Sequence, residues 1–244
     1  MERPIALVTG GARGIGRGVA LHLAERGWDL ALCYRSSRGG ADATVADLVA
    51  RGARGLAVQA DVSDEGQAAA LFTRVRAQLG PIDALVHAAG PYHRRALLDE
   101  TPAGWRDMLG GNLDSFFYCA RLAAPEMIAR RRGRIVGFGM ANADRVEAFP
   151  SVAAHYIAKV GVLALVRSFA RALAEHGVTV NAVSPGYIDS GSSPPDEMAA
   201  ALRHIPAGRL GTIADAVGAV AYFLSDEAAY VTGANLIVGG GWGL

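Results

Sequence analysis

Short apolar runs alternate with longer stretches of helical periodicity along almost the whole chain, and this alternation restricts the folds that the sequence can adopt. The runs predicted to be strands are Ile5–Thr9, Asp29–Tyr34, Gly55–Gln59, Ala84–Ala88, Arg134–Phe138, Thr179–Val183 and Asn235–Val238. The stretches predicted to be helices are Gly14–Arg26, Ala41–Arg51, Glu65–Leu79, Ala103–Arg130, Val152–His176 and Ala214–Leu224. The pattern predicts an α/β fold, a single doubly wound domain in which a seven-stranded parallel sheet carries helices on both faces.

The length and the absence of a linker predict one domain. The chain has 244 residues, of which 51% are hydrophobic, and no stretch rich in Pro and Ser divides it. We therefore expect residues 1–244 to form a single unit. The longest irregular stretch extends from Ser184 to Thr212 and contains several prolines. Because long loops are frequently functional, we predict a substrate lid near residues 186–212.

Charge and cysteine content exclude several classes of partner. The formal net charge is +1, from 24 basic and 23 acidic residues, and the arginines are scattered, so we expect binding neither to nucleic acid nor to a membrane. Cys33 and Cys119 lie inside apolar runs without the spacing of a disulfide framework or a zinc site. No signal peptide or membrane-spanning stretch is recognised. These observations predict a cytoplasmic protein without a bound metal.

A glycine-rich turn follows the first predicted strand and opens the first predicted helix. Gly10, Gly14 and Gly16 lie in this turn together with Arg13 and Ile15. Glycine allows the backbone to approach a pyrophosphate closely, and the start of a helix offers free N–H groups to phosphate oxygens. Strand, turn and helix in this order predict a dinucleotide site formed by these five residues.

The glycine spacing and several later segments resemble the short-chain dehydrogenase/reductase family, particularly its members similar to 3-oxoacyl-acyl-carrier-protein reductase. The later segments are Asp61-Val62, Ala88-Ala89-Gly90, Gly111-Asn112-Leu113, Pro185-Gly186-Tyr187-Ile188-Asp189-Ser190, Val231-Thr232-Gly233 and Val238-Gly239-Gly240-Gly241. The resemblance covers the whole chain and implies a Rossmann fold with a nicotinamide cofactor. The further cofactor contacts that it implies are Asp61, Val62, Ala89, Gly90, Lys159, Pro185, Gly186, Ile188 and Ser190. The chain departs from the family at His87, where an asparagine is usual, and at Gly239, where an aspartate is usual.

The end of the second predicted strand favours NADP(H) over NAD(H). An NAD site commonly places a carboxylate there, whereas this chain has Arg35 and Ser36. A guanidinium can bind a 2′-phosphate through paired hydrogen bonds, and Arg13 could add a second positive charge. We therefore expect NADP(H) to be preferred, with NAD(H) possible.

The predicted catalytic motif departs from the family at both groups that would contact a substrate oxygen. The family places a tyrosine four residues before a lysine, and here Lys159 is preceded at that interval by His155. The position of the family's serine falls on Met140 or Asn142, depending on the direction of counting. Asn112 matches the asparagine that holds a water behind the lysine. The resemblance thus retains the two supporting residues and loses the two substrate-facing ones.

Three interpretations of this motif remain open. His155 could replace the tyrosine, because residues four apart share one helix face with Lys159. Tyr156 could instead supply the hydroxyl after a rearrangement of the helix start. In the third interpretation the protein binds the cofactor without turnover and has a regulatory or structural role. Asn142 could orient a carbonyl through its amide, or it could belong to an ordinary surface turn.

The catalytic candidates are therefore Asn112, Asn142, His155, Tyr156 and Lys159. The sequence predicts an oxidoreductase that transfers hydride between NADP(H) and a small-molecule carbonyl or alcohol. The family resemblance also implies a homo-oligomer, a tetramer or a dimer, with contacts through the helices that begin near Ala103 and Val152. The substrate is not identifiable from the sequence.

Overall fold

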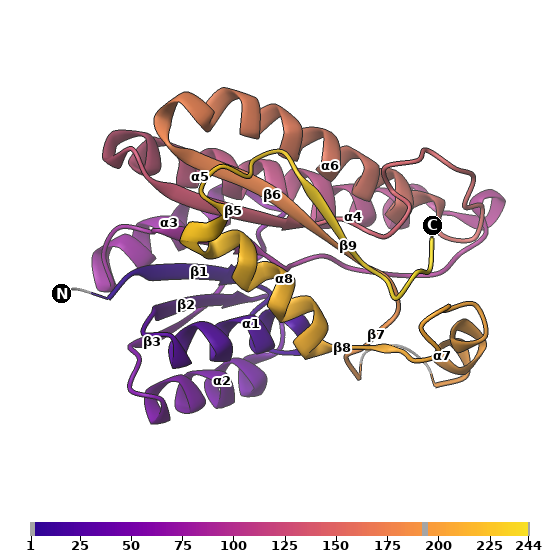
Figure 1. The fold of residues 1–244 in the computed structure, drawn as a ribbon, viewed down its shortest axis with the longest axis horizontal. Helices are drawn as coiled ribbons and strands as arrows, with labels where there is room; N and C mark the ends of the chain where they lie inside the picture. The colour runs from indigo at the N-terminus through magenta and orange to yellow at the C-terminus, as the bar shows by residue number, and fades with distance from the viewer. Residues whose placement is uncertain (1–2, 192–194, 244) are drawn as a thin grey trace.

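The computed structural model describes residues 3–191 and 195–243 and confirms the predicted parallel sheet (Figure 1). Seven strands are hydrogen-bonded in the order β3-β2-β1-β4-β5-β6-β9, and every neighbouring pair is parallel. The strands are β1 (Ile5–Thr9), β2 (Asp29–Tyr34), β3 (Gly55–Gln59), β4 (Ala84–His87), β5 (Gly133–Phe138), β6 (Val178–Pro185) and β9 (Asn235–Val238). The order reverses beside β1, which places a crevice for a ligand at the carboxyl ends of β1 and β4.

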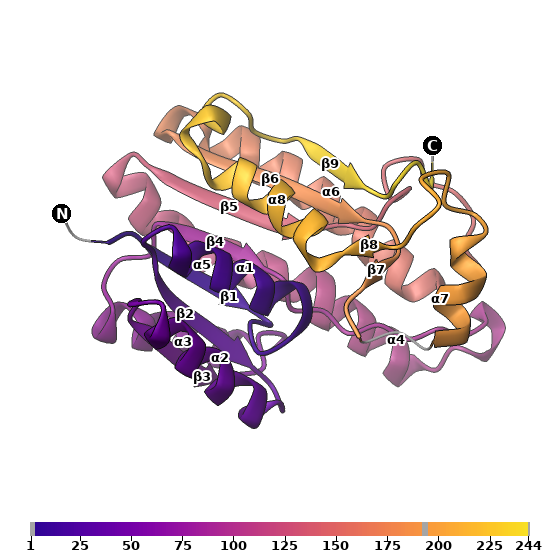
Figure 2. The ribbon, with the colours of Figure 1, turned by 60° about the horizontal axis from the view of Figure 1, so that its bottom comes forward.

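Helices cover both faces of the sheet, and each face has its own apolar core (Figures 1 and 2). One core contains side chains of α1 (Gly14–Glu25), α2 (Arg38–Ala50) and α8 (Ile213–Leu224), among them Leu23, Leu48 and Phe223. The other contains side chains of α3 (Glu65–Gln78), α5 (Ser115–Arg130) and α6 (Ala153–Leu173), among them Phe72 and Phe116. The five central strands β2, β1, β4, β5 and β6 are buried from both sides, which explains why they read as continuous apolar runs, whereas the edge strands β3 and β9 are partly exposed.

The single helix predicted over Ala103–Arg130 is interrupted, and that prediction was wrong in this detail. The chain forms α4 (Pro102–Leu109), a π-helical turn at Gly110–Asp114 and then α5. Nδ2 of Asn112 donates to the carbonyl oxygen of Met108 at 3.0 Å, so a side chain competes with the backbone donors of this turn. The interruption therefore coincides with a residue predicted to be functional.

The stretch Ser184–Thr212, predicted to be irregular, contains regular structure. It includes β7 (Ile188–Asp189), which pairs with β8 (Gly211–Thr212), and α7 (Pro195–Leu202). Figure 2 shows these elements beyond the carboxyl end of the sheet, on the same side as the C-terminus. Met198 on α7 is buried, which explains how so short a helix is stabilised within a proline-rich segment.

Within the described residues, none of the helices has the length and apolar character needed to cross a membrane. The same part of the chain contains no group of three or more His, Cys, Asp or Glu side chains able to hold a metal ion.

Candidate active site

The glycine turn after β1 has the shape that a pyrophosphate requires. Gly10 and Gly14 have φ of 67° and 56°, in the left-handed region that glycine adopts without strain. A Cβ on Gly16 would lie 2.5 Å from the carbonyl oxygen of Gly10, whereas a Cβ on Gly14 would meet only Ser190, at 3.8 Å. Arg13 precedes α1 without a side-chain capping hydrogen bond. The turn thus leaves open space and free N–H groups at a helix start, and these features fit a dinucleotide.

Residues predicted to bind the nicotinamide end lie on the segment that follows β6. Ser190 approaches Gly14, so this segment reaches the glycine turn. Ile188 is buried and pairs with Gly211, which fixes the segment's backbone. A Cβ on Gly186 would lie 3.0 Å from the Cα of Gly239, so a larger residue does not fit there. Pro185 ends β6 at this point. The predicted contacts at both ends of the cofactor therefore lie along one edge of the sheet.

Arg35 lies between two carboxylates at the end of β2. Its Nη1 is 3.8 Å from Oδ2 of Asp61 and 3.6 Å from Oδ1 of Asp107 on α4. The Arg35 side chain is 57% exposed, so neither contact immobilises it. Ser36 is exposed beside it and Val62 is buried. Sequence reasoning anticipated Arg35 and Asp61 but missed Asp107, because α4 approaches the end of β2 only in the folded chain.

His87, at the position of the family's first asparagine, belongs to a buried hydrogen-bond chain. Ser115 Oγ donates to the carbonyl oxygen of Gly111 at 2.7 Å, so it accepts from Nε2 of His87 at 3.0 Å. Burial, and secondarily the Lys159 charge, lower the pKa of His87 to about 3. The neutral ring leaves Nδ1 to accept from Thr9 Oγ1 at 3.1 Å. His87 therefore links β1 and β4 to the start of α5 and does not face a substrate.

The same chain of hydrogen bonds continues into the turn after β4. Thr9 Oγ1, which donates to His87, also accepts from the backbone N–H of Ala89 at 3.1 Å. The turn that the resemblance assigns to the cofactor, at Ala89 and Gly90, is consequently fixed from β1. Sequence reasoning did not identify Thr9 or Ser115 in this role, because each hydroxyl bonds to a residue that is distant in the sequence.

Asn112 and Lys159 converge on Gly90. A Cβ on Gly90 would lie 2.4 Å from Oδ1 of Asn112 and 3.6 Å from Nζ of Lys159, so both side chains reach the same point. Nζ donates to the carbonyl oxygen of Phe138 at 3.0 Å, and Nδ2 of Asn112 donates to Pro91 at 3.0 Å. Oδ1 of Asn112 is buried and has no partner within the described residues. Burial lowers the pKa of Lys159 to about 8.

His155 lies in the first turn of α6, one helical turn before Lys159. Its ring meets the ring of Tyr92 edge-on, with centroids 5.1 Å apart. Burial, and after it the charge of Lys159, lower the pKa of His155 to about 3, and a hydrogen bond to the Pro91 backbone only partly opposes this. Nδ1 is buried without a partner among the residues described. A buried polar atom without a partner is costly, and substrate-binding sites are one place where it occurs.

Tyr156, the neighbouring candidate, has its hydroxyl engaged elsewhere. The hydroxyl donates to the carbonyl oxygen of Asn142 at 3.2 Å and accepts from the backbone N–H of Glu147 at 2.8 Å. The side chain is 4% exposed, and its ring packs against Phe149 with centroids 4.6 Å apart. A role in proton donation would require this hydroxyl to release both bonds.

Asn142 lies in a turn that is buried rather than on the surface. Its side chain is 7% exposed, and its φ of 72° is left-handed. A Cβ on Gly243 would lie 1.8 Å from Oδ1 of Asn142, so this amide lies against the C-terminal tail. Trp242 of the tail packs against Tyr187, with ring centroids 4.8 Å apart. Met140 is partly buried against the core formed with α5 and α6.

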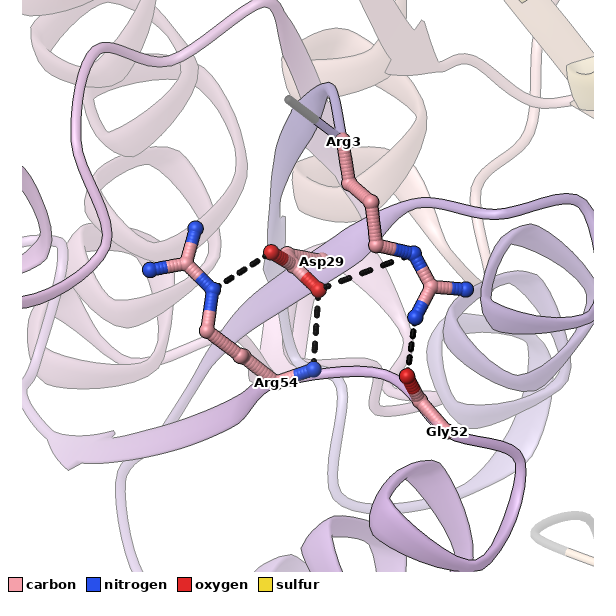
Figure 3. Close-up of a pocket in the computed structure, with 4 residues that line it drawn as sticks. All are labelled: Arg3, Asp29, Gly52 and Arg54. Atoms are coloured by element: carbon pink, nitrogen blue, oxygen red, sulfur yellow. Dashed lines mark hydrogen bonds and ion pairs between the residues drawn. The ribbon is translucent and has the colours of Figure 1, made fainter. Parts of the chain in front are cut away.

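Two further hollows lie away from His155. Figure 3 shows Asp29 of β2 between Arg54, whose Nε is 2.6 Å away, and Arg3, in a cavity of about 360 Å³ at the amino end of the sheet. These ion pairs join the starts of β1, β2 and β3. A second cavity, of about 450 Å³, lies between β9 and α8 and includes Tyr222 and Leu236.

Comparisons with known proteins agree with this geometry. Residues 10–243 match the family model described as enoyl-(acyl carrier protein) reductase. The chain is 38% identical over 239 residues to 3-oxoacyl-[acyl-carrier-protein] reductase of Staphylococcus aureus, which covers 97% of this chain and 96% of the relative. A putative short-chain alcohol dehydrogenase from Sinorhizobium meliloti superposes with a TM-score of 0.92 at 32% identity, covering 99% of this chain and 97% of the other.

A blue fluorescent protein from a metagenomic library, solved in complex with NADPH, also superposes with a TM-score of 0.92 at 32% identity, covering 100% of this chain and 99% of the other. Sequence relatives and structural neighbours thus agree over nearly the full length. The chain belongs to the short-chain dehydrogenase/reductase family and is similar within it to the 3-oxoacyl-acyl-carrier-protein reductases.

Proposed function

We propose that the protein is an NADP(H)-dependent oxidoreductase in which His155 contacts the substrate oxygen. The observation that carries the proposal is the position of His155, with a buried, unpartnered Nδ1 among the described residues, one helical turn from Lys159. The retained supports, Asn112 and Lys159, meet at Gly90 beside it. When bound, the nicotinamide supplies or accepts the hydride. The substrate would be a carbonyl compound or the corresponding alcohol.

NADP(H) is favoured by the charge at the end of β2. Arg35 is exposed, and its ion pairs with Asp61 and Asp107 are both longer than 3.5 Å, so its guanidinium is available to a 2′-phosphate. Arg13 is exposed at the start of α1 and could add a second positive charge. The NADPH complex of the metagenomic relative is consistent with this preference.

The proton for the product oxygen would pass through His155. With a pKa near 3 the ring is neutral at physiological pH and carries one proton. Nδ1 donates this proton to a carbonyl oxygen, as neutral histidines do in other enzymes, in the tautomer in which Nε2 has released its hydrogen bond to the Pro91 backbone. Loss of this proton alone would leave an imidazolate, so the other ring nitrogen takes up a proton as the first is given. Lys159, with a pKa near 8, is the neighbouring proton source. Reduction should accordingly slow as the pH rises above about 8, because Lys159 loses its proton.

Substitution of His155 tests this assignment directly. NADPH affinity is measured by fluorescence titration, and NADPH consumption is then followed with a panel of ketones, β-keto thioesters and quinones. We expect His155→Ala to lower kcat/KM for reduction about 100-fold, the scale of general acid catalysis, while NADPH affinity changes less than about twofold. The matched control is His176→Ala, because His176 lies just after the far end of α6, away from the site.

Two results would contradict the proposal. Full activity in His155→Ala would exclude the ring as the group that contacts the oxygen. NADPH binding by the unmodified protein without turnover on the whole panel would favour a binding protein with a regulatory or structural role.

We also propose that the protein is a homo-oligomer through α5 and α6. Phe117 on α5 is 39% exposed and Ile157 on α6 is 45% exposed, so each helix presents an apolar side chain outward. Light scattering coupled to size-exclusion chromatography gives the mass, and a monomer at micromolar concentration would contradict this proposal.

A further inference from the structure

The segment between β5 and α6 holds a backbone conformation that its own residues disfavour. Asn142 and Val146 both have left-handed φ, of 72° and 54°. Asparagine tolerates this region, but valine is β-branched and is strained there. Val146 is 75% exposed, so packing of its side chain does not hold it. Other contacts must therefore maintain the turn.

The hydroxyl of Tyr156 spans this turn. It accepts from the N–H of Glu147, directly after Val146, and donates to the carbonyl oxygen of Asn142 at the turn's beginning. The two left-handed residues, Asn142 and the strained Val146, thus lie within the stretch whose ends the hydroxyl joins. Packing of the buried Tyr156 ring against Phe149 holds the hydroxyl in place. The bond to Asn142 is buried and the bond to Glu147 is partly buried, so solvent competes little with the first and more with the second.

We propose that Tyr156 is a positioning residue that fastens the segment 142–147 to the first turn of α6. Tyr156 adjoins His155, so the same attachment sets the direction of the His155 ring relative to the segment that carries Asn142. The inference rests on the proposed function for its catalytic consequence, whereas the attachment itself is independent of it. Tyr156 acts through the backbone and through His155, without contact with the substrate.

The variant Tyr156→Phe removes the hydroxyl and keeps the ring. Loss of two hydrogen bonds should raise the hydrogen-exchange rate of the Glu147 amide about tenfold or more. We expect kcat/KM for ketone reduction to fall about tenfold, mainly through a higher KM, while NADPH affinity stays within about twofold. Phe149→Leu is the matched control, because it weakens the same packing but leaves both hydrogen bonds.

A second substitution separates positioning from proton donation. Glycine adopts left-handed φ without strain, so Val146→Gly should restore at least about half of the lost activity, on a logarithmic scale, in the Tyr156→Phe background. Rescue of this kind is expected only if the hydroxyl acts by holding the turn. If Tyr156→Phe alone does not fold, the same activity and hydrogen-exchange measurements are made on the double variant.

Three outcomes would overturn the proposal. Unchanged exchange at Glu147 in Tyr156→Phe would show that the attachment is absent. A fall in kcat without a rise in KM or in exchange would make Tyr156 a catalytic residue instead. If Val146→Gly does not restore activity in the Tyr156→Phe background, backbone strain at Val146 is not what the hydroxyl opposes. An unmodified protein that shows no turnover refutes the proposed function, but the exchange measurement still decides the attachment.

Discussion

The proposed cofactor end of the site relies on backbone atoms, whereas the proposed catalytic end relies on side chains. At the cofactor end, the decisive groups are backbone atoms of a glycine turn, where Gly16 leaves no room for a Cβ. At the catalytic end, the decisive groups are side chains on α6 and on the segment before it, where His155 and Tyr156 diverge toward different partners. A site made from backbone tolerates few sequences, whereas a site made from side chains can exchange its chemistry while the fold persists.

Burial sharpens the contrast between the two ends. Arg35 at the cofactor end is exposed and keeps its charge in water. Lys159 and His155 at the catalytic end are desolvated, and burial is the largest cause of both lowered pKa values. Perturbed groups of this kind cluster where chemistry takes place, and charges left in water suit recognition of a phosphate. The predictions below test the proposed cofactor end and the buried hydrogen-bond chain of His87 by separate measurements.

The largest effect is expected from Gly16→Val. Its Cβ would lie 2.5 Å from the carbonyl oxygen of Gly10, so the turn must open and lose its approach to a pyrophosphate. We expect NADPH affinity to fall about 100-fold or more in a fluorescence titration. Gly218→Ala in α8, whose added Cβ meets nothing within 4 Å, is the control. Retained affinity would place the cofactor somewhere other than this turn.

Arg35→Asp should change which cofactor is bound. A carboxylate repels a 2′-phosphate and accepts hydrogen bonds from a ribose, so the ratio of NADPH to NADH affinity should fall about tenfold or more. Arg74→Asp, an exposed position on α3, makes the same charge change away from the site. An unaltered affinity ratio would refute the proposed preference for NADP(H) but would not bear on the proposed role of His155.

A smaller effect is expected from His87→Asn, and it concerns stability. The unfolded imidazole takes up a proton near pH 6.5, whereas folded His87, with a pKa near 3, stays neutral. The free energy of unfolding should therefore rise with pH between about 3 and 6.5, and each such histidine contributes up to about 1.4 kcal/mol per pH unit. Denaturant titrations should show that His87→Asn loses this share of the slope.

Ser115→Ala separates the loss of the hydrogen bond from the titration of His87. It removes the hydroxyl that accepts from Nε2 of His87, so we expect a loss of about 1–2 kcal/mol while the pH dependence remains. An equal slope in His87→Asn and in the unmodified protein would mean that His87 titrates normally in the folded state.

The smallest effect is expected from Asp107→Asn. This carboxylate lies 3.6 Å from Arg35 and competes with a phosphate for it, so its removal should strengthen NADPH binding about twofold. NADH affinity should not change, because NADH carries no 2′-phosphate. Asp226→Asn, an exposed carboxylate beside Arg134, serves as the control. Weaker NADPH binding would show that Asp107 orients Arg35 rather than competing with it.

Much of the fold was predictable because the central strands are buried on both faces and helices separate the strands along the chain. The seven strands of the main sheet were located within about two residues at each end, and their parallel direction follows from the alternation, whereas the short strands β7 and β8 were not predicted. The break at Asn112 was missed, because apolar periodicity continues through a π-helical turn in which the Asn112 side chain donates to the backbone of Met108. The helix α7 was missed because proline and glycine conceal a short amphipathic pattern.

The sequence predicted the residues of the proposed cofactor end better than the side-chain directions at the proposed catalytic end. Glycine spacing and Arg35 are local signals, and the structure places the glycines after β1 and Arg35 after the neighbouring strand β2. The direction of a side chain is not local. Tyr156 and His155 are adjacent in the sequence, yet only the fold shows that one hydroxyl binds the segment before α6 while the other ring meets Tyr92.

The hydrogen-bond chain through His87 has a consequence for how such sequences can diverge. Each hydroxyl and the imidazole has a single proton, and each proton is already directed to the next acceptor, from Thr9 to the ring and from the ring to Ser115. Replacing one member by a side chain without matching polar atoms leaves a neighbouring buried donor without an acceptor, or a buried acceptor without a donor. Positions 9, 87 and 115 should therefore covary among relatives, and an intermediate with only one exchange should be less fit than either end state.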